Sequence, residues 1–241
     1  MGIISRLNPL VEALNAPACR VQKILIQKDA KREKIKEIVI LAGKRRIPYA
    51  LVPKKKLDDL DPRHQGAVAF AAEKKTAALN AIISSSPSPF ILLLDGIEDP
   101  QNLGAIIRTA ESAGADGIVL PERRAAGLTG TVARVSAGAL EHIKIARVTN
   151  LAQAMDRLRK DQIWLVGAEG GSSQHWYEFD FTLPVGIVLG SEGKGLRPLI
   201  RKKCDKILSL PLSGKLTSLN VSSAAAVFMY EVVRQRKGKK D

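Results

Sequence analysis

The stretch Phe90-Ile-Leu-Leu-Leu-Asp-Gly-Ile-Glu-Asp-Pro-Gln-Asn-Leu-Gly-Ala-Ile-Ile-Arg108 decides the fold class. It begins with a continuous apolar run, which is typical of a strand covered on both faces. A turn follows, and Asp99 with Pro100 is typical of a helix N-cap followed by proline at the first helical position. A buried strand that leads directly into a helix predicts one unit of a parallel α/β sheet.

The same alternation of apolar runs and amphipathic segments continues to the end of the chain. Further strands are expected at 117–120, 143–148, 163–167, 185–189 and 207–210. Helices are expected at 102–115, 129–141, 151–160, 196–203 and 222–236. This alternation predicts a largely parallel sheet with helices on both faces.

The first third of the chain has a shorter alternation of its own. Helices are expected at 3–15, 30–42 and, as a short turn or helix, 53–60; strands are expected at 21–26, 47–52 and 67–71. The run Ser84-Ser-Ser-Pro-Ser-Pro89 is typical of a linker. We therefore expect a small α/β domain at 1–75, a linker at 76–89 and a second domain at 90–241.

The chain is strongly basic. Its 241 residues have a formal net charge of +14, and residues 1–75 contain 17 lysines and arginines against 8 acidic residues. Basic side chains neutralise phosphates, so nucleic acid is the first partner to expect, and a solvated basic surface is the alternative. Aromatic residues are only 4% of the chain, so we expect contact with phosphate and shape rather than a base-stacking platform.

The cysteine pattern and the absence of targeting signals indicate a cytoplasmic protein. Cys19 and Cys204 are far apart and lack metal-ligand spacing, so neither a disulfide framework nor a metal site is predicted. Isolated cysteines are typical of buried thiols in a reducing cytosol. We expect no signal peptide at the N-terminus and no membrane span, because no apolar run reaches about 18 residues.

Two more stretches join a strand-like run to a glycine-containing loop, namely Leu189-Gly-Ser-Glu-Gly-Lys-Gly-Leu196 and Leu210-Pro-Leu-Ser-Gly-Lys-Leu-Thr-Ser-Leu-Asn-Val-Ser222. Ligands of open α/β sheets bind at the carboxyl ends of strands. The glycine-rich loop is no P-loop, because Gly195 stands where a magnesium-binding Ser or Thr would be needed. Glu192 within it would repel a triphosphate, so a neutral or cationic ligand fits better.

Each candidate side chain also has a simpler interpretation. Asn102 and Arg108 could contact a phosphate, whereas Arg108 could equally pair with Glu111 one turn along the helix. Glu192 could be a solvent-facing residue of a tight turn. Ser218 or Asn220 could cap the last helix and do nothing more.

These three stretches, in this order, resemble the motifs of the SPOUT superfamily, in its SpoU/TrmH branch of RNA 2′-O-ribose methyltransferases. The first 75 residues resemble an RNA-binding domain related to ribosomal kink-turn proteins. Within the branch, the chain is most similar to the bacterial enzymes that methylate a guanosine of 23S rRNA. His64-Gln-Gly66 also resembles a sequence in related enzymes, so His64 is either an RNA contact or a structural histidine.

The resemblance implies a homodimer, a trefoil knot in the second domain and S-adenosylmethionine as cofactor. The catalytic residues that it implies are Asn102, Arg108, Glu192, Ser218 and Asn220. The cofactor-binding residues that it implies are Gly167, Ala168, Leu189, Gly190, Leu210, Leu212 and Leu219. Arg108 would activate the ribose hydroxyl electrostatically or through a neighbouring phosphate, because its own pKa is too high for it to act as a base.

The same motifs leave other functions open. The substrate could be a guanosine of tRNA, or the modification could confer resistance to an antibiotic that targets the ribosome. A function of another class is a ribosome-assembly factor that binds RNA without catalysis.

Overall fold

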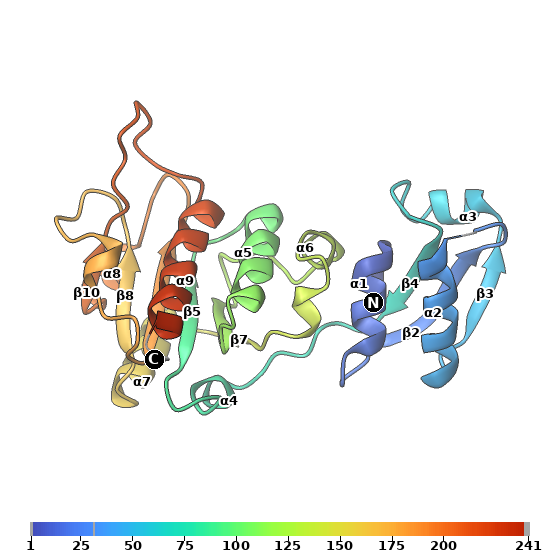
Figure 1. Cartoon of the computed structure of the whole chain (residues 1–241), viewed down its shortest axis with the longest axis horizontal. Helices are drawn as coiled ribbons and strands as arrows, with labels where there is room; N and C mark the ends of the chain where they lie inside the picture. Colours follow the sequence, from blue (N-terminus) through green and yellow to red (C-terminus); the bar gives the residue numbers. More distant parts are fainter. Residues whose placement is uncertain (1, 31, 239–241) are drawn as a thin grey trace. The chain divides into compact units, whose positions relative to one another are not determined.

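The computed structural model describes residues 2–30 and 32–238 and confirms the expected α/β fold. These residues form two compact units (Figure 1). The first unit comprises the described residues up to Lys75 together with Gly127–His142, and the second comprises Thr76–Ala126 and the described residues from Ile143 onward. The chain therefore passes from one unit to the other three times.

A four-stranded sheet frames the first unit, in the order β1-β4-β2-β3. β2 and β3 are parallel, and the other neighbouring strands are antiparallel. The strands are β1 Gly2–Ile4, β2 Val21–Gln27, β3 Tyr49–Val52 and β4 Ala67–Ala71. The helices are α1 Leu7–Asn15, α2 Glu33–Lys44, α3 Lys54–Asp58, α6 Gly130–Val135 and the 3-10 helix η1 Ala139–Glu141. The helix expected at 3–15 is wrong at its start, because Ile3 and Ile4 pair with β4.

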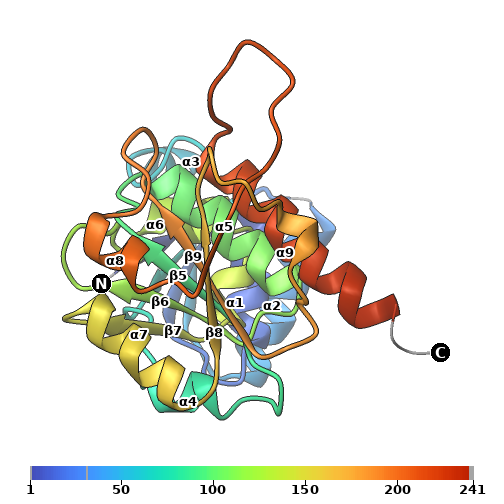
Figure 2. The same ribbon diagram turned by 90° about the vertical axis from the view of Figure 1, so that its left-hand side faces the viewer.

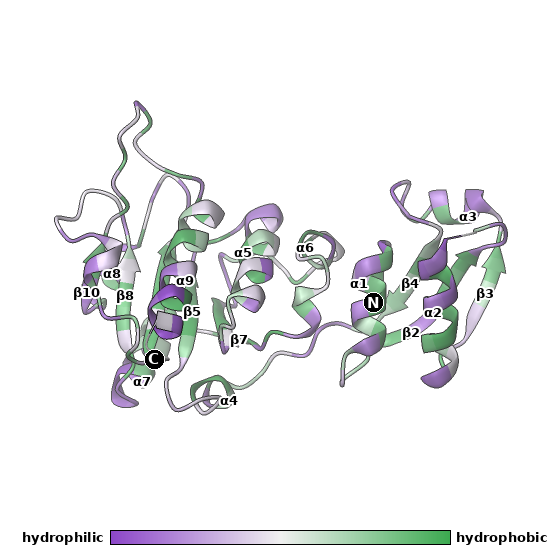
Figure 3. Ribbon diagram, viewed as in Figure 1, coloured by the Kyte–Doolittle hydropathy of each residue, from purple (hydrophilic) through white to green (hydrophobic). Residues whose placement is uncertain are grey.

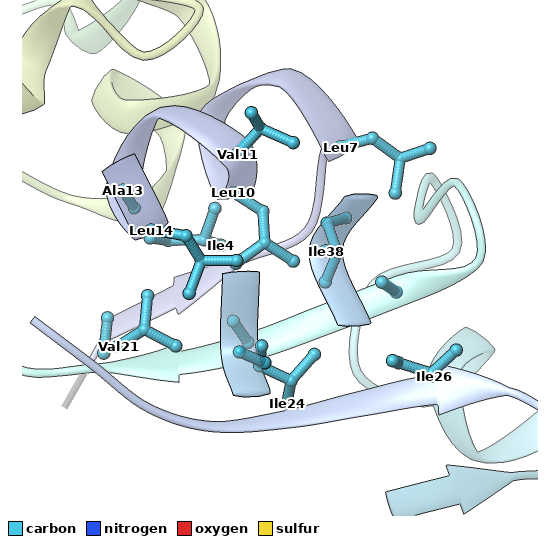
Figure 4. Close-up of a cluster of buried hydrophobic side chains, with 14 of the residues drawn as sticks. Ile4, Leu7, Leu10, Val11, Ala13, Leu14, Val21, Ile24, Ile26 and Ile38 are labelled. Carbon is cyan, nitrogen blue, oxygen red and sulfur yellow. The ribbon is translucent and has the colours of Figure 1, made fainter. Parts of the chain in front are cut away.

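The core of the first unit lies between this sheet and helices α1 and α2 (Figure 4). α1 buries Leu7, Leu10, Val11 and Leu14, a spacing that places all four side chains on one helix face. They meet β2 side chains such as Ile24, which is fully buried. α1 also packs against α2, so the two helices cover one face of the sheet together.

The segment 127–142 follows β6 of the second unit but packs within the first. A single helix was expected at 129–141, and the structure instead breaks it at Ala137 and Gly138, with φ of 54° and 104°. The glycine is required there, because an added Cβ would lie 2.5 Å from Cγ of Glu12. Arg20 anchors the end of the segment through a bidentate contact, with Nη2 2.7 Å from Oε1 of Glu141 and Nε 3.0 Å from Oε2.

A six-stranded parallel sheet frames the second unit, in the order β10-β8-β9-β5-β6-β7. The strands are β5 Phe90–Asp95, β6 Gly117–Pro121, β7 Ile145–Val148, β8 Trp164–Ala168, β9 Val185–Gly190 and β10 Lys206–Leu208. Every residue of β5 is buried, as expected for a strand covered on both faces. The prediction of a parallel sheet is thus confirmed.

Helices cover both faces of this sheet (Figure 2). α5 and α9 pack side by side, whereas α7 lies over the face that contains Leu93 and Val188. Figure 3 shows the central strands in green, and the helices carry hydrophilic residues in purple. The helices are α4 Leu79–Ile83, α5 Pro100–Ser112, α7 Leu151–Lys160, α8 Pro198–Lys202, α9 Val221–Gly238 and the 3-10 helix η2 Trp176–Glu178.

The serine- and proline-rich stretch 84–89 belongs to the second unit, where Arg236 of α9 holds it. The guanidinium of Arg236 donates to the backbone oxygens of Ser88 at 2.9 Å and Phe181 at 3.0 Å. Burial lowers the pKa of Arg236 from its usual value. The guanidinium of Arg236 thus binds carbonyl groups of segments outside α9.

Because all six strands are parallel, their carboxyl ends meet at one edge of the sheet. Four neighbouring strands end there at Asp95, Gly190, Ala168 and Leu208. The chain from 209 to 220 leaves β10 at this edge and projects beyond the sheet before α9 begins (Figure 2). Residues 211–220 are all exposed.

We expect Gly138→Ala to destabilise the protein by about 2 to 3 kcal/mol, because the new side chain meets Glu12 and opposes a positive φ. Urea unfolding followed by circular dichroism measures this. The control is Gly43→Ala, since Gly43 lies in α2 with nothing within 4 Å of an added Cβ. That variant should gain about 0.4 to 1 kcal/mol. Equal midpoints for Gly138→Ala and wild type would show that segment 127–142 packs differently.

Candidate active site

Three side chains from distant parts of the second unit meet at the carboxyl edge of the sheet. Nδ2 of Asn220 lies 2.9 Å from Oδ1 of Asn102 and 3.5 Å from Oε2 of Glu192. Nδ2 of Asn102 lies 3.3 Å from the same carboxylate oxygen. Both amides therefore donate to one oxygen of Glu192, and the three predicted residues form a single cluster.

Asn102 is positioned by the start of α5. The carboxylate of Asp99 accepts from the backbone N–H groups of Gln101 and Asn102, each at 3.1 Å. Pro100 occupies the first helical position, so the expected capped helix start is confirmed.

Asn220 is positioned by the start of α9. Its Oδ1 accepts from the backbone N–H of Ser222 at 2.9 Å and from the hydroxyl of Ser222 at 2.6 Å. The expected cap is thus confirmed for Asn220. The same side chain uses its oxygen for the cap and its nitrogen for the cluster, so Asn220 does more than cap α9.

Glu192 is positioned by a tight turn at the end of β9. Ser191 and Gly195 exchange two backbone hydrogen bonds, of 3.1 and 2.9 Å. Gly193 and Gly195 have φ of 81° and 65°, a region that glycine adopts without strain. A Cβ on Gly190 would lie 2.2 Å from the carbonyl carbon of Gly195, so only glycine permits the turn to fold back this closely.

A cavity of about 690 Å³ opens beside this cluster. Asn102 and Glu192 line it, together with Asp95, Arg124 and Arg197, which sequence reasoning did not select. Asp95 is the carboxylate that ends the buried strand β5, and its side chain is fully buried. Its oxygens accept from the backbone N–H of Arg197 at 3.0 Å and from Nε at 2.6 Å. A charged residue directly after an apolar strand was the signal that could have identified it.

Arg108 and Ser218 do not join the cluster. Arg108 is exposed on α5, and its side chain forms neither a hydrogen bond nor an ion pair with any described residue, so the alternative pairing with Glu111 is not observed. It follows Asn102 by six residues, which places it about 120° around the helix and about 9 Å along it. Ser218 lies in the exposed segment 211–220.

The seven residues expected to bind the cofactor lie at the ends of three neighbouring strands. Two end β8, two end β9 and three belong to the segment after β10: Gly167, Ala168, Leu189, Gly190, Leu210, Leu212 and Leu219. None of them lines the cavity described above. A Cβ on Gly167 would lie 2.7 Å from Ile207 and 3.0 Å from the sulfur of Cys204, so packing alone requires glycine there.

Two other sequence features have structural explanations. The side chain of His64 is 3% exposed. Its Nδ1 accepts from the backbone N–H of Gly66 at 3.0 Å, so its Nε2 carries the proton and donates to Asp58. Hydrogen bonds from Lys54 and His64 lower the pKa of Asp58. Burial raises the pKa of the Cys204 thiol to about 12, as in an unreactive structural cysteine.

Among the described residues, no three His, Cys, Asp or Glu side chains lie close enough together to hold a metal ion. The helices that the structure describes include none that is both long and apolar enough to cross a bilayer.

Comparison with known proteins accounts for both parts of the chain. Residues 89–230 match the SpoU rRNA Methylase family, and residues 7–77 match the family of RNA 2′-O ribose methyltransferase substrate-binding domains. The chain belongs to the SpoU methylase family. Family members are S-adenosylmethionine-dependent RNA 2′-O-ribose methyltransferases, and this chain is one of them.

Relatives and solved structures agree with the family. YacO of Bacillus subtilis (strain 168), named as a TrmH family tRNA/rRNA methyltransferase, is 42% identical over 95% of this chain and 94% of its own. The SpoU methyltransferase AviRb from Streptomyces viridochromogenes superposes with a TM-score of 0.84 and 27% identity, over 98% of this chain and 90% of AviRb. AviRb in complex with AdoMet superposes with a TM-score of 0.83.

The strand ends of this SpoU methylase fit S-adenosylmethionine. Leu212 and Leu219 are 40% and 44% exposed, so the segment after β10 offers partly exposed apolar side chains. Such side chains suit an adenine ring, and the backbone groups that end β8 and β9 suit its ring nitrogens. The carboxylates at this edge suit a cationic ligand and disfavour a polyphosphate.

We expect Gly190→Ala to lower kcat for methyl transfer about 100-fold, because the turn must move and take Glu192 out of the cluster. Gly170→Ala is the matched control, since an added Cβ there meets nothing within 4 Å. Transfer of labelled methyl groups to RNA measures both, and circular dichroism checks that both variants fold. Wild-type kcat in Gly190→Ala would disconnect the turn from the site.

Proposed function

We propose that this chain methylates the ribose 2′-hydroxyl of a guanosine in 23S rRNA, and that Asn102, Glu192 and Asn220 hold the target ribose. The cluster of these three side chains carries the proposal. It offers amide donors and a carboxylate acceptor beside a cavity large enough for a nucleotide, a combination suited to ribose hydroxyls. The excess of basic residues in 1–75 supports RNA binding by the first unit.

The carboxylate of Glu192 orients the hydroxyl. Its Oε2 accepts from the two amides, whereas Oε1 has no hydrogen bond to any described residue. Oε1 therefore accepts from a hydroxyl of the bound ribose and aligns it for transfer. When bound, S-adenosylmethionine supplies the electrophilic methyl group; the residues proposed to hold it are those at the ends of β8, β9 and β10. Ser218 lies in the segment that would close over the site.

Arg108 stabilises the negative charge that develops on the ribose oxygen, and a neighbouring phosphate accepts the proton. The position of Arg108 on α5, about 120° from Asn102, supports a role across a dimer rather than within one chain. A homodimer has a suitable surface on α9, where Val227 and Tyr230 are 38% and 51% exposed. Tyr177 next to α9 is also 51% exposed.

The remaining proposals concern the arrangement and setting of the protein. We propose that segments after β9 form a trefoil knot. We also propose that residues 1–75 bind RNA, that residues 90–241 transfer the methyl group, and that residues 76–89 link the two domains. The protein acts in the cytoplasm, where its RNA substrates are found. The knot is tested by tracing the path of the chain in an experimental structure.

The test of function supplies methyl-labelled S-adenosylmethionine with unmodified 23S rRNA and, separately, with tRNA. We expect 2′-O-methylguanosine in 23S rRNA. Label only in tRNA would support the tRNA alternative, and label in neither would indicate that the substrate is a ribosomal precursor particle and not naked RNA. Loss of antibiotic susceptibility in cells that express the chain would support the resistance alternative.

We expect Asn220→Asp to lower methyl transfer at least about 100-fold, because the new carboxylate faces Glu192 and the amide donor is gone. The variant keeps the oxygen that caps α9, so its unfolding midpoint should stay near that of the wild type.

Arg108→Ala should abolish turnover with cofactor affinity unchanged, as measured by calorimetry. Wild-type turnover in either variant would contradict the assigned roles.

Tyr230→Arg should shift the protein from dimer to monomer, because a charge replaces an apolar side chain at the proposed interface. Sedimentation velocity measures the shift. Lys237→Ala, a change on the same helix at an exposed position, is the control and should leave the dimer intact. A wild-type protein that sediments as a monomer at all concentrations would refute the interface.

A further inference from the structure

Arg124 lies at the apex of a short loop that the structure holds at both ends. The loop follows β6, and the backbone N–H of Glu122 donates to Val148 at 2.9 Å. At the other end, the N–H of Ala126 donates to Ile97 at 2.8 Å, and Arg147 donates to the carbonyl of Ala126 at 3.0 Å. Hydrogen bonds therefore fix both ends of the loop that contains Arg124.

The backbone at Arg124 is in the left-handed region, with φ of 60°. Glycine adopts this region without strain, and an arginine there is unusual. The position therefore carries a long cationic side chain where glycine would be free of strain. Such strained positions cluster at functional sites, where the side chain has a role that offsets the strain.

Arg124 lines the cavity beside the Asn102–Glu192–Asn220 cluster. Seven charged residues line this cavity: Asp95, Glu98, Asp99, Arg124, Glu192, Lys194 and Arg197. Most of them are engaged, since Asp95 binds Arg197, Asp99 caps α5, and Glu192 accepts from two amides.

The two remaining cations of the cavity have no protein partner. Neither Arg124 nor Lys194 forms a hydrogen bond or an ion pair with a described residue, and both are exposed. Among the described residues that line the cavity, Glu98 is the only acidic residue whose side chain also forms no hydrogen bond or ion pair. A free guanidinium in a cavity that receives RNA matches the geometry of a phosphate, which it can bind through two parallel hydrogen bonds.

We propose that Arg124 binds a backbone phosphate of the RNA next to the target ribose, and that Lys194 adds a second positive charge for the same strand. The proposal rests on the assignment of the ribose to the Asn102–Glu192–Asn220 cluster. Each ribose in an RNA strand is flanked by phosphates, so a cation that lines the same cavity as the ribose site fixes the register of the strand. Arg124 thus selects an RNA strand over a free nucleoside.

The chain offers a matched control in Arg123, which is adjacent, equally charged and exposed, but does not line the cavity. The variants are Arg124→Ala, Arg124→Lys, Arg124→Gly and Arg123→Ala. Steady-state methyl transfer is measured with 23S rRNA and tRNA transcripts. Binding of the same transcripts is measured at several KCl concentrations, and cofactor affinity by calorimetry.

For Arg124→Ala and Arg124→Gly we expect KM for RNA to rise about 10- to 100-fold, as for a lost charge-assisted hydrogen-bonded contact. The slope of log affinity against log salt concentration should become shallower by the amount that corresponds to about one phosphate contact. Arg124→Lys should recover part of the affinity, and cofactor binding should not change. Arg123→Ala should stay within about twofold of wild type, because an exposed charge away from the strand is screened.

Arg124→Gly separates binding from folding, because glycine relieves the positive φ while it removes the guanidinium. A loss of RNA affinity with an unchanged unfolding midpoint supports the proposal. Equal behaviour of Arg124→Ala and Arg123→Ala in KM and salt slope would overturn it. If the wild type methylates neither transcript, the proposed substrate fails, and the salt slope of binding still decides the role of Arg124.

Discussion

The arrangement of the site depends on one buried carboxylate. Asp95 ends the central strand β5, and its side chain is removed from water and paired with the backbone and guanidinium of Arg197. A buried carboxylate without this partner would be strongly destabilising, so the contact holds Arg197 at the end of β5. Because Arg197 follows the turn 191–195, the contact ties that turn to the end of β5. Asn102 lies in the first turn of α5, which begins at Pro100 a few residues beyond the same strand.

The cluster also links the site to the stability of a helix. Asn220 accepts from the backbone N–H of Ser222 with its side-chain oxygen and reaches Asn102 and Glu192 with its nitrogen. A helix start without such a cap is less stable by about 1 kcal/mol. The ordering of α9 and the assembly of the cluster are therefore coupled, and the segment 209–220 is tied down at its α9 end by the residue that completes the site.

Local patterns predicted most of the elements. The buried run Phe90–Leu94 predicted a central parallel strand, and Asp99 with Pro100 predicted a helix start, because both features depend on neighbours in sequence. The break at Ala137 and Gly138 could not be read from periodicity, since it depends on φ and on contact with Glu12. The pair of Asp95 with Arg197 joins residues 102 positions apart, a distance over which spacing carries no information.

The site shows the same contrast between features that neighbours in sequence determine and features that only the folded chain reveals. The three motifs predicted Asn102, Glu192 and Asn220, which the structure brings together, but they gave no reason to separate these from Arg108. The separation follows from helix geometry once the start of α5 is fixed at Pro100. Arg124 could not be singled out from the sequence, because the residues next to it show no apolar period and belong to none of the three motifs. Its conformation and its place in the cavity become evident only in three dimensions.

The segment 127–142 limits how the protein can be taken apart. It belongs by packing to the first unit, although it is encoded between strands of the second. A fragment that begins at Thr76 would carry Val132 and Leu140, both fully buried in the whole chain, without the α1 surface that η1 packs against. Exchange of RNA-binding units between relatives would thus require two grafts, and recombination at the single junction after Lys75 would yield a chimera with a mismatched interior.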